Sequence, residues 1–409
     1  MHLTRRGALA GAAALTTAPL IGARAQARPK IRLGVLTDLS GTYRDTTGPN
    51  SVACARQAVE EFNPSAHGFD VEVLAADHQN KPDVASSIAR QWYDQGVDAT
   101  VDVPTSSVAL AVSQVSKDKN KILLDASAAS TDVTDKQCSP NTIVWSFDNY
   151  MLAVSQGGSI VKQPDGKTWF ILTANYVFGI TLEEQTTDVV KKGGGTVKGA
   201  LRYPFPETTD FSSYLQQAQA SGAKVLGLAN AGADTVNCIK QAHEFGLNKS
   251  MTIAPLLIFL TDVHALGPDL AQGLNVTTSF YWDYNDRTRA FTKRVLPKLT
   301  NGSYPNMAHA SAYSIVLHYL KTAAAMGPEN AKKSGRDTVA RMKGMAVDDD
   351  CFQGRIRSDG RGEFPAYLWK AKAPSKPGGW DLFEYVSTTP AAQVLHPLNP
   401  KCEFPVAGA

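Results

Sequence analysis

The sequence predicts an α/β protein that consists of two doubly wound lobes, each built on a parallel sheet. Short apolar runs alternate with segments of helical periodicity along most of the chain, which is typical of parallel sheets covered by helices on both faces. The alternation pauses after residue 124 and resumes at residue 169, so the elements form two sets. The 409 residues also exceed what one hydrophobic core of ordinary size holds.

The first set opens with an apolar strand, followed by a helix introduced at Gly48. Pro82 begins the next helix, at a position where its missing N–H costs nothing, and Ser106 or Ser107 caps the third. Because helices separate the strands, the strands should run parallel. They are expected over residues 31–36, 71–74, 99–103 and 122–124.

The second set repeats this order, and two long helices and a hairpin follow it. An Asp-Gly pair, Asp359-Gly360, lies between apolar segments and predicts a hairpin over residues 352–369. The expected strands of the second set cover residues 169–173, 196–201, 223–228 and 251–254. The expected helices run from near Ile180 to the glycines at 193–195 and over 211–220, 235–245, 287–299 and 307–325.

The passages between the sets predict how the chain divides into lobes. No low-complexity linker separates the sets, so the connections should be short and ordered. We expect three crossings, near residues 145–149, 278–281 and 344–350. Lobe 1 then comprises residues 30–146 and 280–344, lobe 2 comprises 147–279 and 345–390, and a tail covers 391–409.

The first 27 residues predict an export signal. Arg5 and Arg6 precede a short apolar stretch at residues 9–21, and Ala25-Gln26-Ala27 fits a cleavage site. The arginine pair fits twin-arginine export, and an ordinary secretory signal that holds two arginines is the alternative. No cysteine follows directly, so no lipid anchor is expected there, and no segment is long enough to cross a membrane. We therefore expect a periplasmic protein that is not membrane-spanning.

The charge balance argues against nucleic acid as a partner. Without the predicted leader, Lys and Arg fall from 41 to 38, which equals the 38 Asp and Glu. A chain without net charge has no general field that attracts phosphate polymers. Neither a Gly-x-Ser-x-Gly nor a His-Glu-x-x-His motif occurs, no Cys or His cluster has metal-ligand spacing, and we expect no cofactor and no enzyme activity.

Five cysteines are available in an oxidising compartment, where a pair can form a disulfide. Cys54 and Cys238 lie in helical patterns and should be small buried apolar residues. Cys138, Cys351 and Cys402 lie outside them, and the sequence alone does not set which of these three pair. We favour Cys138–Cys402, which would fasten the tail to the body.

These features together resemble the leucine/isoleucine/valine-binding family of ABC-transporter solute-binding proteins, which have the type I periplasmic fold. The resemblance covers most of the chain after the leader. No single motif is diagnostic, but eight occur in the family's order. They are residues 31–41, 53–63, 77–82, 104–107, 125–130, the Tyr176-Val177-Phe178-Gly179 loop, residues 241–247 and the hairpin at 352–360.

The resemblance implies a mechanism of ligand capture. Two lobes close on a small molecule by hinge motion, and an inner-membrane permease recognises the closed, monomeric protein. Ligands of open parallel sheets bind beyond the carboxyl ends of the strands. Helix N-termini at that edge offer free N–H groups, which suit a carboxylate.

Serine-rich loops after two strands of lobe 1 are the candidates for that carboxylate. Ser106 and Ser107 open a helix, so they can bind a ligand or simply cap the helix. The resemblance implies that the loop after the next strand, with Ser127, Ala128 and Ser130, uses its backbone and hydroxyl groups for the charged end of the ligand. The competing interpretation of that loop is a solvated turn.

The remaining candidates are aromatic or amide residues of both lobes. Tyr43 and Phe178 can enclose a planar ligand, although Phe178 can equally be a core contact at a helix start. Asn230 and Gly232 offer an amide and a close backbone approach. Three further candidates are Phe259, Tyr281, which belongs either to the pocket or to the hinge, and His309, which can point into the cleft or be structural.

Two departures from the family favour a ligand less polar than an α-amino acid. The amino-acid binders place an acidic side chain in lobe 2, where this chain has the apolar run 255–260, and Asp262 and Glu183 lie near that spot but not at it. Phe178 stands where the family has a tyrosine. These departures favour a carboxylate-bearing ring. The resemblance keeps branched-chain and other hydrophobic amino acids as the other option, so we expect a small organic carboxylate of one of these two classes. The alternative function is a ligand-sensing receptor component of the same fold.

Overall fold

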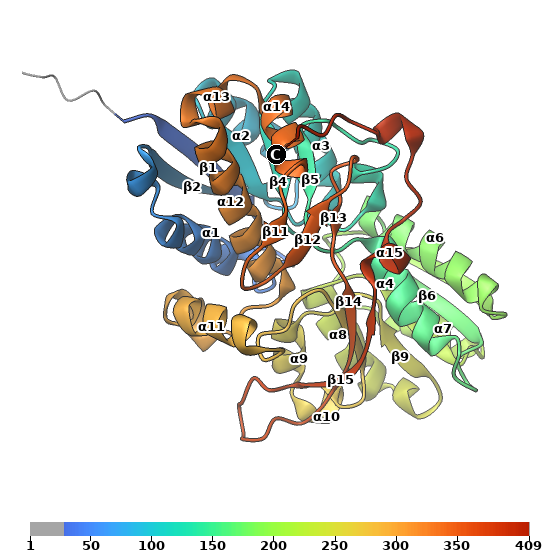
Figure 1. Ribbon diagram of the computed structural model, residues 1–409. Helices are drawn as coiled ribbons and strands as arrows, with labels where there is room; N and C mark the ends of the chain where they lie inside the picture. Colours follow the sequence, from blue (N-terminus) through green and yellow to red (C-terminus); the bar gives the residue numbers. More distant parts are fainter. Residues whose placement is uncertain (1–27, 409) are drawn as a thin grey trace, which may run out of the picture.

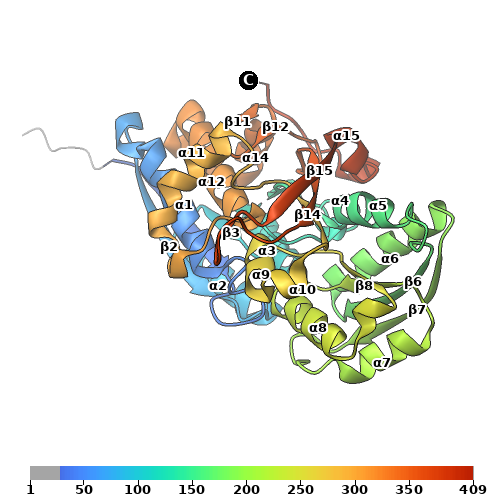
Figure 2. The same cartoon turned by 90° about the horizontal axis from the view of Figure 1, so that it is seen from below.

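The computed structural model describes residues 28–408 and shows two lobes (Figure 1). The predicted export signal lies outside the described residues. In Figure 2 the lobes lie side by side, with α1, α2 and α12 in one and α6, α7 and α8 in the other. Within residues 28–408, no helix combines the length and the apolar composition that crossing a membrane requires.

Lobe 1 is a five-stranded parallel sheet in the order β2-β1-β3-β4-β5. Helices α1 and α12 pack together, as do α2 and α3. The strands are β1 (Lys30–Thr37), β2 (Asp70–Asp77), β3 (Ala99–Asp102), β4 (Ile122–Asp125) and β5 (Thr142–Val144). The helices are α1 (Gly48–Phe62), α2 (Pro82–Asp94), α3 (Ser106–Asp118), α11 (Asp286–Val295), α12 (Met307–Met326), α13 (Pro328–Lys333) and α14 (Gly335–Lys343).

Lobe 2 is a four-stranded parallel sheet in the order β7-β6-β8-β9. An antiparallel sheet, β10-β14-β15, accompanies it. The strands are β6 (Thr168–Ala174), β7 (Thr196–Tyr203), β8 (Val225–Ala229), β9 (Thr252–Pro255), β10 (Asn275–Thr278), β14 (Ala366–Ala371) and β15 (Phe383–Thr389). The helices are α4 (Asn149–Leu152), α5 (Gly158–Ile160), α6 (Val177–Lys192), α7 (Ser212–Ala220), α8 (Ala233–Glu244), α9 (Leu260–Leu266) and α10 (Pro268–Ala271). The predicted α/β class with two parallel-sheet lobes is confirmed.

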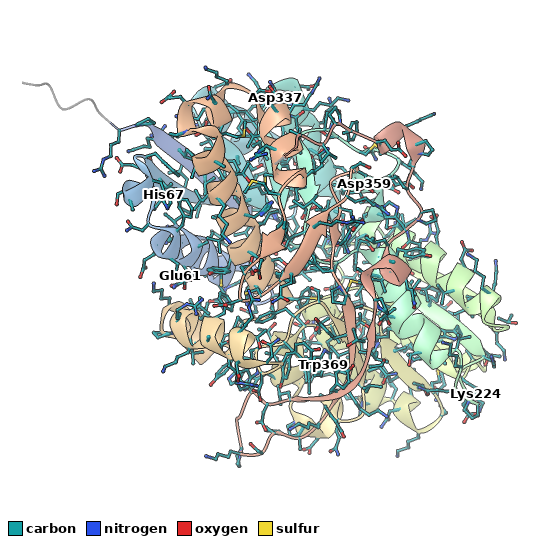
Figure 3. All side chains as sticks on the ribbon, viewed as in Figure 1. Glu61, His67, Lys224, Asp337, Asp359 and Trp369 are labelled. Carbon is teal, nitrogen blue, oxygen red and sulfur yellow. A yellow bond between two sulfur atoms is a disulfide. The ribbon has the colours of Figure 1, made fainter. Side chains whose placement is uncertain are left out.

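The third crossing lies later in the chain than the sequence predicts. The expected hairpin forms from β12 (Gln353–Ile356) and β13 (Gly362–Glu363), and β11 (Val347–Asp348) pairs with β12. Val144 at the edge of lobe 1 donates its N–H to Gly360 O at 3.0 Å, so residues 345–363 belong to lobe 1 and not to lobe 2. Residues 367–369, which the prediction includes in this hairpin, lie instead in β14, which pairs with β10 and β15 in lobe 2. Figure 3 shows Asp359 in one lobe and Trp369 in the other.

The tail forms a fourth connection between the lobes, in addition to the three crossings that the sequence analysis expects. After β15 in lobe 2 the chain passes α15 (Ala391–Val394) and returns to lobe 1 (Figure 1). There His396 Nε2 lies 2.9 Å from Thr134 Oγ1, and Ala407 N donates to Ala340 O at 2.9 Å. A disulfide joins Cys138 to Cys402, which is the pairing that the sequence analysis favours.

Candidate ligand-binding site

A small pocket lies between the lobes, at the carboxyl ends of the strands of both parallel sheets. Its walls come from the segments that follow β1, β3 and β4 in lobe 1 and β6, β8 and β9 in lobe 2. The pocket enclosed by these walls has a volume of about 20 Å³, which is enough for about one water molecule. A larger ligand therefore requires the lobes to move apart. The lining residues are Tyr43, Thr46, Thr47, Pro104, Ser127, Ala129, Tyr176, Phe178, Ala231, Leu257 and Phe259.

Contacts across the cleft hold the two lobes together beside the pocket. The hydroxyl oxygens of Tyr43 and Tyr176 are 2.5 Å apart, and both rings stack on Phe205. Ala233 N of lobe 2 donates to Thr42 O of lobe 1 at 3.2 Å. The structure therefore has the lobes closed on one another at the mouth of the site.

Gly232 permits this close approach of the two backbones. Its φ is 62°, a conformation that side chains other than glycine seldom adopt. A Cβ atom at this position would lie 2.6 Å from Thr42 O. Glycine is therefore needed here for closure. The approach is to the backbone of the other lobe, and Gly232, which the sequence analysis expects near the ligand, does not line the pocket.

The Tyr43 loop is held by a buried carboxylate at the end of β1. Asp38 accepts hydrogen bonds from the N–H of Gly41 at 2.6 Å and of Tyr43 at 2.8 Å. It also accepts from Asn80 Nδ2 at 2.7 Å. These bonds connect the loops after β1 and β2, so the position of the Tyr43 ring is set by the sheet edge beneath it.

Strained backbone follows β3 and brings Pro104 to the pocket. Asp102 and Val103 have φ angles of 79° and 66°, which is rare for any residue with a side chain and rarest for a β-branched one. Such strain persists only where the surrounding structure enforces it, and it clusters at functional sites.

The loop after β4 is organised by two buried aspartates. Asp125 Oδ1 accepts from Ser127 N at 3.0 Å and from Ala128 N at 2.8 Å. Ser127 Oγ donates to Asp102 Oδ1. Burial raises the pKa of Asp102 to about 6 and that of Asp125 well above its usual value. The loop that carries Ser127 is thus attached to the ends of both β3 and β4.

Four of the predicted site residues line the pocket, namely Tyr43, Ser127, Phe178 and Phe259. The other serines lie deeper or aside. Ser106 Oγ accepts from Ser130 N at 3.1 Å and Ser130 Oγ lies 3.2 Å from Thr181 Oγ1, while Ala128 is buried and Ser107 half-buried beside the pocket. The residue before α3 is Thr105, and its hydroxyl bonds Asn80 instead of capping the helix.

The remaining predicted residues are placed away from the pocket walls. Asn230 turns into lobe 2, where its Oδ1 accepts from Thr235 Oγ1 at 2.7 Å. Tyr281 packs on Trp369 and Phe383 of the antiparallel sheet, which is the hinge alternative. His309 is fully buried on α12, where its Nδ1 accepts from Asn306 N at 3.2 Å, and burial lowers its pKa to about 3. His309 is therefore a neutral structural residue.

Sequence reasoning missed several lining residues. Tyr176 lies two positions before Phe178 in a quoted motif, and its place at a helix start was the available signal. Thr46 and Thr47 directly precede α1, as a helix start again would indicate. For the apolar or small residues at this edge no local signal exists, because similar residues occur throughout the core: Pro104, Ala129, Ala231 and Leu257.

Asp262, an acidic residue near the pocket, holds backbone and is not free for a ligand. Its Oδ2 accepts from the N–H of Phe259 at 2.9 Å, so it orients the loop that carries the Phe259 ring. Burial, with a smaller contribution from Asp45, raises the pKa of Asp262 from 3.8 to about 7.

This shift predicts how Asp262 affects stability. Between about pH 4 and pH 7 the unfolded chain loses a proton that the folded chain keeps, so the contribution of Asp262 to stability falls as pH rises. In Asp262→Asn the free energy of unfolding should therefore fall less steeply, or rise more steeply, over this range than in the wild type. Urea unfolding at pH 4, 5.5 and 7 measures the free energy of unfolding of both proteins. The same pH dependence in the variant and the wild type would contradict the expectation.

Comparison with known proteins agrees with this geometry. Residues 30–377 match the family model of periplasmic binding proteins. A periplasmic binding protein from Burkholderia mallei is 41% identical over 92% of this chain and 98% of its own, with a TM-score of 0.85. A branched-chain amino acid ABC transporter ligand-binding protein from Burkholderia xenovorans is 37% identical, over 90% and 97% of the chains, with a TM-score of 0.77.

A third relative shows likeness of fold alone. It is an ABC-transporter solute-binding protein from R. palustris in complex with 4-hydroxybenzoate, 21% identical over 88% of this chain and 97% of its own, with a TM-score of 0.79. The match to the family model spans both lobes and the loops that line the pocket. This chain therefore belongs to the family of periplasmic binding proteins.

Proposed function

We propose that this protein captures a small organic carboxylate in the pocket between its lobes and delivers it to the inner-membrane permease of an ABC importer. The ligand is an aromatic acid or a branched-chain or other hydrophobic amino acid. The observation that carries the proposal is the lining of the pocket, to which both lobes contribute and which includes four aromatic rings. A guest that touches both walls stabilises the closed form, and closure is the signal that a permease can read.

Helix starts at the pocket support a carboxylate on the ligand. Helix α3 begins two residues after Pro104 and helix α6 directly after Tyr176, and neither has a side chain bonded to its first N–H groups. Free N–H groups and the partial positive charge of a helix N-terminus attract an anion. A ligand carboxylate would replace the water that otherwise satisfies these groups.

The apolar lining supports a hydrophobic body on the ligand. Among the residues that the structure describes, no charged side chain lines the pocket, whereas four aromatic rings do, those of Tyr43, Tyr176, Phe178 and Phe259. Rings of this kind pack well against a planar ligand. The R. palustris relative in complex with 4-hydroxybenzoate and the branched-chain amino acid protein of B. xenovorans are consistent with both ligand classes.

A thermal-shift screen over amino acids, aromatic acids and their amides tests the proposal. An aromatic acid or a hydrophobic amino acid should raise the melting temperature with its concentration, because a ligand at a hundred times its Kd stabilises the fold by about 2.7 kcal/mol. Amides that lack the carboxylate should give smaller shifts than the corresponding acids. The proposal fails if no acid of either class shifts the melting temperature, or if the recovered ligand is chemically altered.

The partner that binds the closed protein distinguishes an importer role from a sensory role. Binding of the ligand-loaded protein to a permease in membrane vesicles supports the importer, and binding to a receptor kinase supports the alternative. The export signal at residues 1–27 stays a prediction, and the N-terminal residue of the protein recovered from the periplasm checks it.

A further inference from the structure

The hydroxyl of Ser127 donates its hydrogen away from the pocket. Its hydrogen is directed to Asp102 Oδ1, while the residue itself lines the pocket. Burial raises the pKa of Asp102 to about 6, so at neutral pH the carboxyl is mostly ionised and can only accept. Ser127 Oγ therefore presents its lone pairs to the pocket. A carboxylate at this point would find no donor, because the only hydrogen of the hydroxyl is already used.

Most of the other hydroxyl groups of the pocket also donate their hydrogens to acceptors within the protein. Thr46 Oγ1 and Thr47 Oγ1 both donate to Tyr43 O, at 2.9 and 3.0 Å. Of the two phenols of Tyr43 and Tyr176, one donates to the other. Five hydroxyl groups line the pocket, and four of their hydrogens are thus engaged, which leaves one phenolic hydrogen. The side chains of the pocket offer acceptors and almost no donors.

Asp102 has an energetically unfavourable environment that packing of the core does not explain. It is fully buried, its φ is 79°, and its Oδ2 has no hydrogen-bond partner within residues 28–408. Burial raises its pKa, the hydroxyls of Ser127, Thr37 and Ser51 lower it, and the charge of Asp38 raises it further. A buried, strained and incompletely bonded carboxylate needs an explanation, and its one strong side-chain contact is the pocket hydroxyl of Ser127.

We propose that Asp102 is a positioning residue that holds Ser127 as a hydrogen-bond acceptor, so that the site selects ligands that donate a hydrogen bond at Ser127. This inference rests on the proposed function and specifies the ligand further. The bond from Ser127 to an ionised carboxylate polarises the hydroxyl and strengthens Oγ as an acceptor. In this arrangement the carboxylate of the ligand lies at a helix N-terminus, and a hydrogen-bond donor of the ligand faces Ser127. The donor can lie next to the carboxylate or at the opposite end of the ligand.

Two sources supply such a donor, a phenolic hydroxyl and an ammonium group. Pairs of ligands that differ only in the donor separate them. 4-Hydroxybenzoate and benzoate differ by the phenol, and leucine and 4-methylpentanoate differ by the ammonium group. For each pair, isothermal titration calorimetry at pH 7.5 gives the ratio of the Kd of the donor-free member to that of the donor member.

In the wild type, this ratio should be about tenfold or more for one of the two pairs, because a missing donor leaves an acceptor in the closed site without a partner. In Asp102→Asn the amide can donate to Ser127 Oγ and release the serine hydrogen toward the pocket. The ratio should then fall to about one or below it. Ser127→Ala removes the acceptor itself and should also bring the ratio near one, so the inference stays testable if the asparagine variant does not fold.

Asp349→Asn is the matched control. Asp349 is another buried carboxyl of lobe 1 that accepts from a serine hydroxyl, Ser314 Oγ at 2.5 Å, but that serine does not line the pocket. It can change the affinity for both members of a pair, and it should leave their ratio as in the wild type. A merely structural role of Asp102 would give the same result in both aspartate variants.

The outcomes separate this inference from the proposed function. If the wild type binds the acids with ratios near one, or if Asp102→Asn and Ser127→Ala keep the wild-type ratio, the inference is wrong and the proposed function stands. If no member of either pair binds, and no other acid of these classes does, both are wrong. A donor preference in the wild type that both variants abolish supports the inference.

Discussion

Replacing Arg361 with alanine should lower the free energy of unfolding by about 3–5 kcal/mol, because it leaves a buried carboxylate without its counter-ion. Arg361 and Asp148 are 0% and 1% exposed, and Arg361 Nε lies 2.7 Å from Asp148 Oδ2. Arg361 Nη1 also donates to the carbonyl oxygens of Trp145 at 2.6 Å and Gly362 at 2.5 Å. The substitution therefore leaves three buried acceptors short of a donor.

The position of this ion pair explains its importance. Asp148 lies in the first crossing and caps α4 through Met151 N at 2.9 Å, and Arg361 lies directly before β13 in the hairpin that precedes the third crossing. Burial alone would raise the pKa of Asp148, but the charge of Arg361, together with smaller effects of His396 and of the hydrogen bonds from Met151 N and Arg361, outweighs burial and lowers the pKa. The pair thus joins the first crossing to the hairpin that precedes the third crossing, so loss of one partner also perturbs the hinge.

Arg355→Ala is the matched control for Arg361→Ala. Arg355 belongs to the same hairpin and pairs with Glu363, but its side chain is 75% exposed. Exposed ion pairs contribute about 0–1 kcal/mol, so the control should remain close to the wild type in urea unfolding followed by circular dichroism. Equal losses in both variants would contradict the assignment of the stability to the buried pair.

Removal of the Cys138–Cys402 disulfide should cost about 2–5 kcal/mol of stability. The bond links residues 264 positions apart, so it restricts the unfolded chain strongly, and long closed loops gain the most from such a link. In the folded protein it holds the end of the fourth connection against lobe 1. The double variant Cys138→Ser/Cys402→Ser should melt at a lower temperature than the wild type.

Reduction and a free-cysteine variant check this effect. Dithiothreitol should lower the melting temperature of the wild type toward that of the double variant and leave the double variant unchanged. Cys351→Ser changes a cysteine that the structure shows unpaired, so its response to dithiothreitol should equal that of the wild type. The interpretation is wrong if the wild type and the double variant melt together under oxidising conditions.

Most of the sheet strands could be predicted because their signal is local. The apolar runs at 31–36 and 169–173 appear as β1 and β6, and Pro82 begins α2 as expected. A strand as short as β5 (Thr142–Val144) has too few residues to show a period. The hairpin around Gly360 was also predictable, because an Asp-Gly turn depends on its own backbone conformation, here a φ of 91° at the glycine.

The partners of these elements were harder to predict. The same Asp-Gly turn does not indicate which sheet edge the hairpin joins, and its attachment to Val144 depends on a bond between residues more than two hundred positions apart. The candidate site shows the same limit. Loop position after a strand indicated Tyr43, Ser127, Phe178 and Phe259, but it could not separate them from Asn230, whose side chain turns into its own lobe.

Local periodicity in the chain was enough to establish the two parallel-sheet lobes and the edge where their loops meet, because turns and helix starts depend on neighbouring residues. The pairing of Tyr43 with Tyr176, the hold of Asp102 on Ser127 and the return of the tail to lobe 1 were established by the folded arrangement. These contacts join residues that are distant in sequence, and side-chain direction, packing and burial select them only once the lobes are assembled.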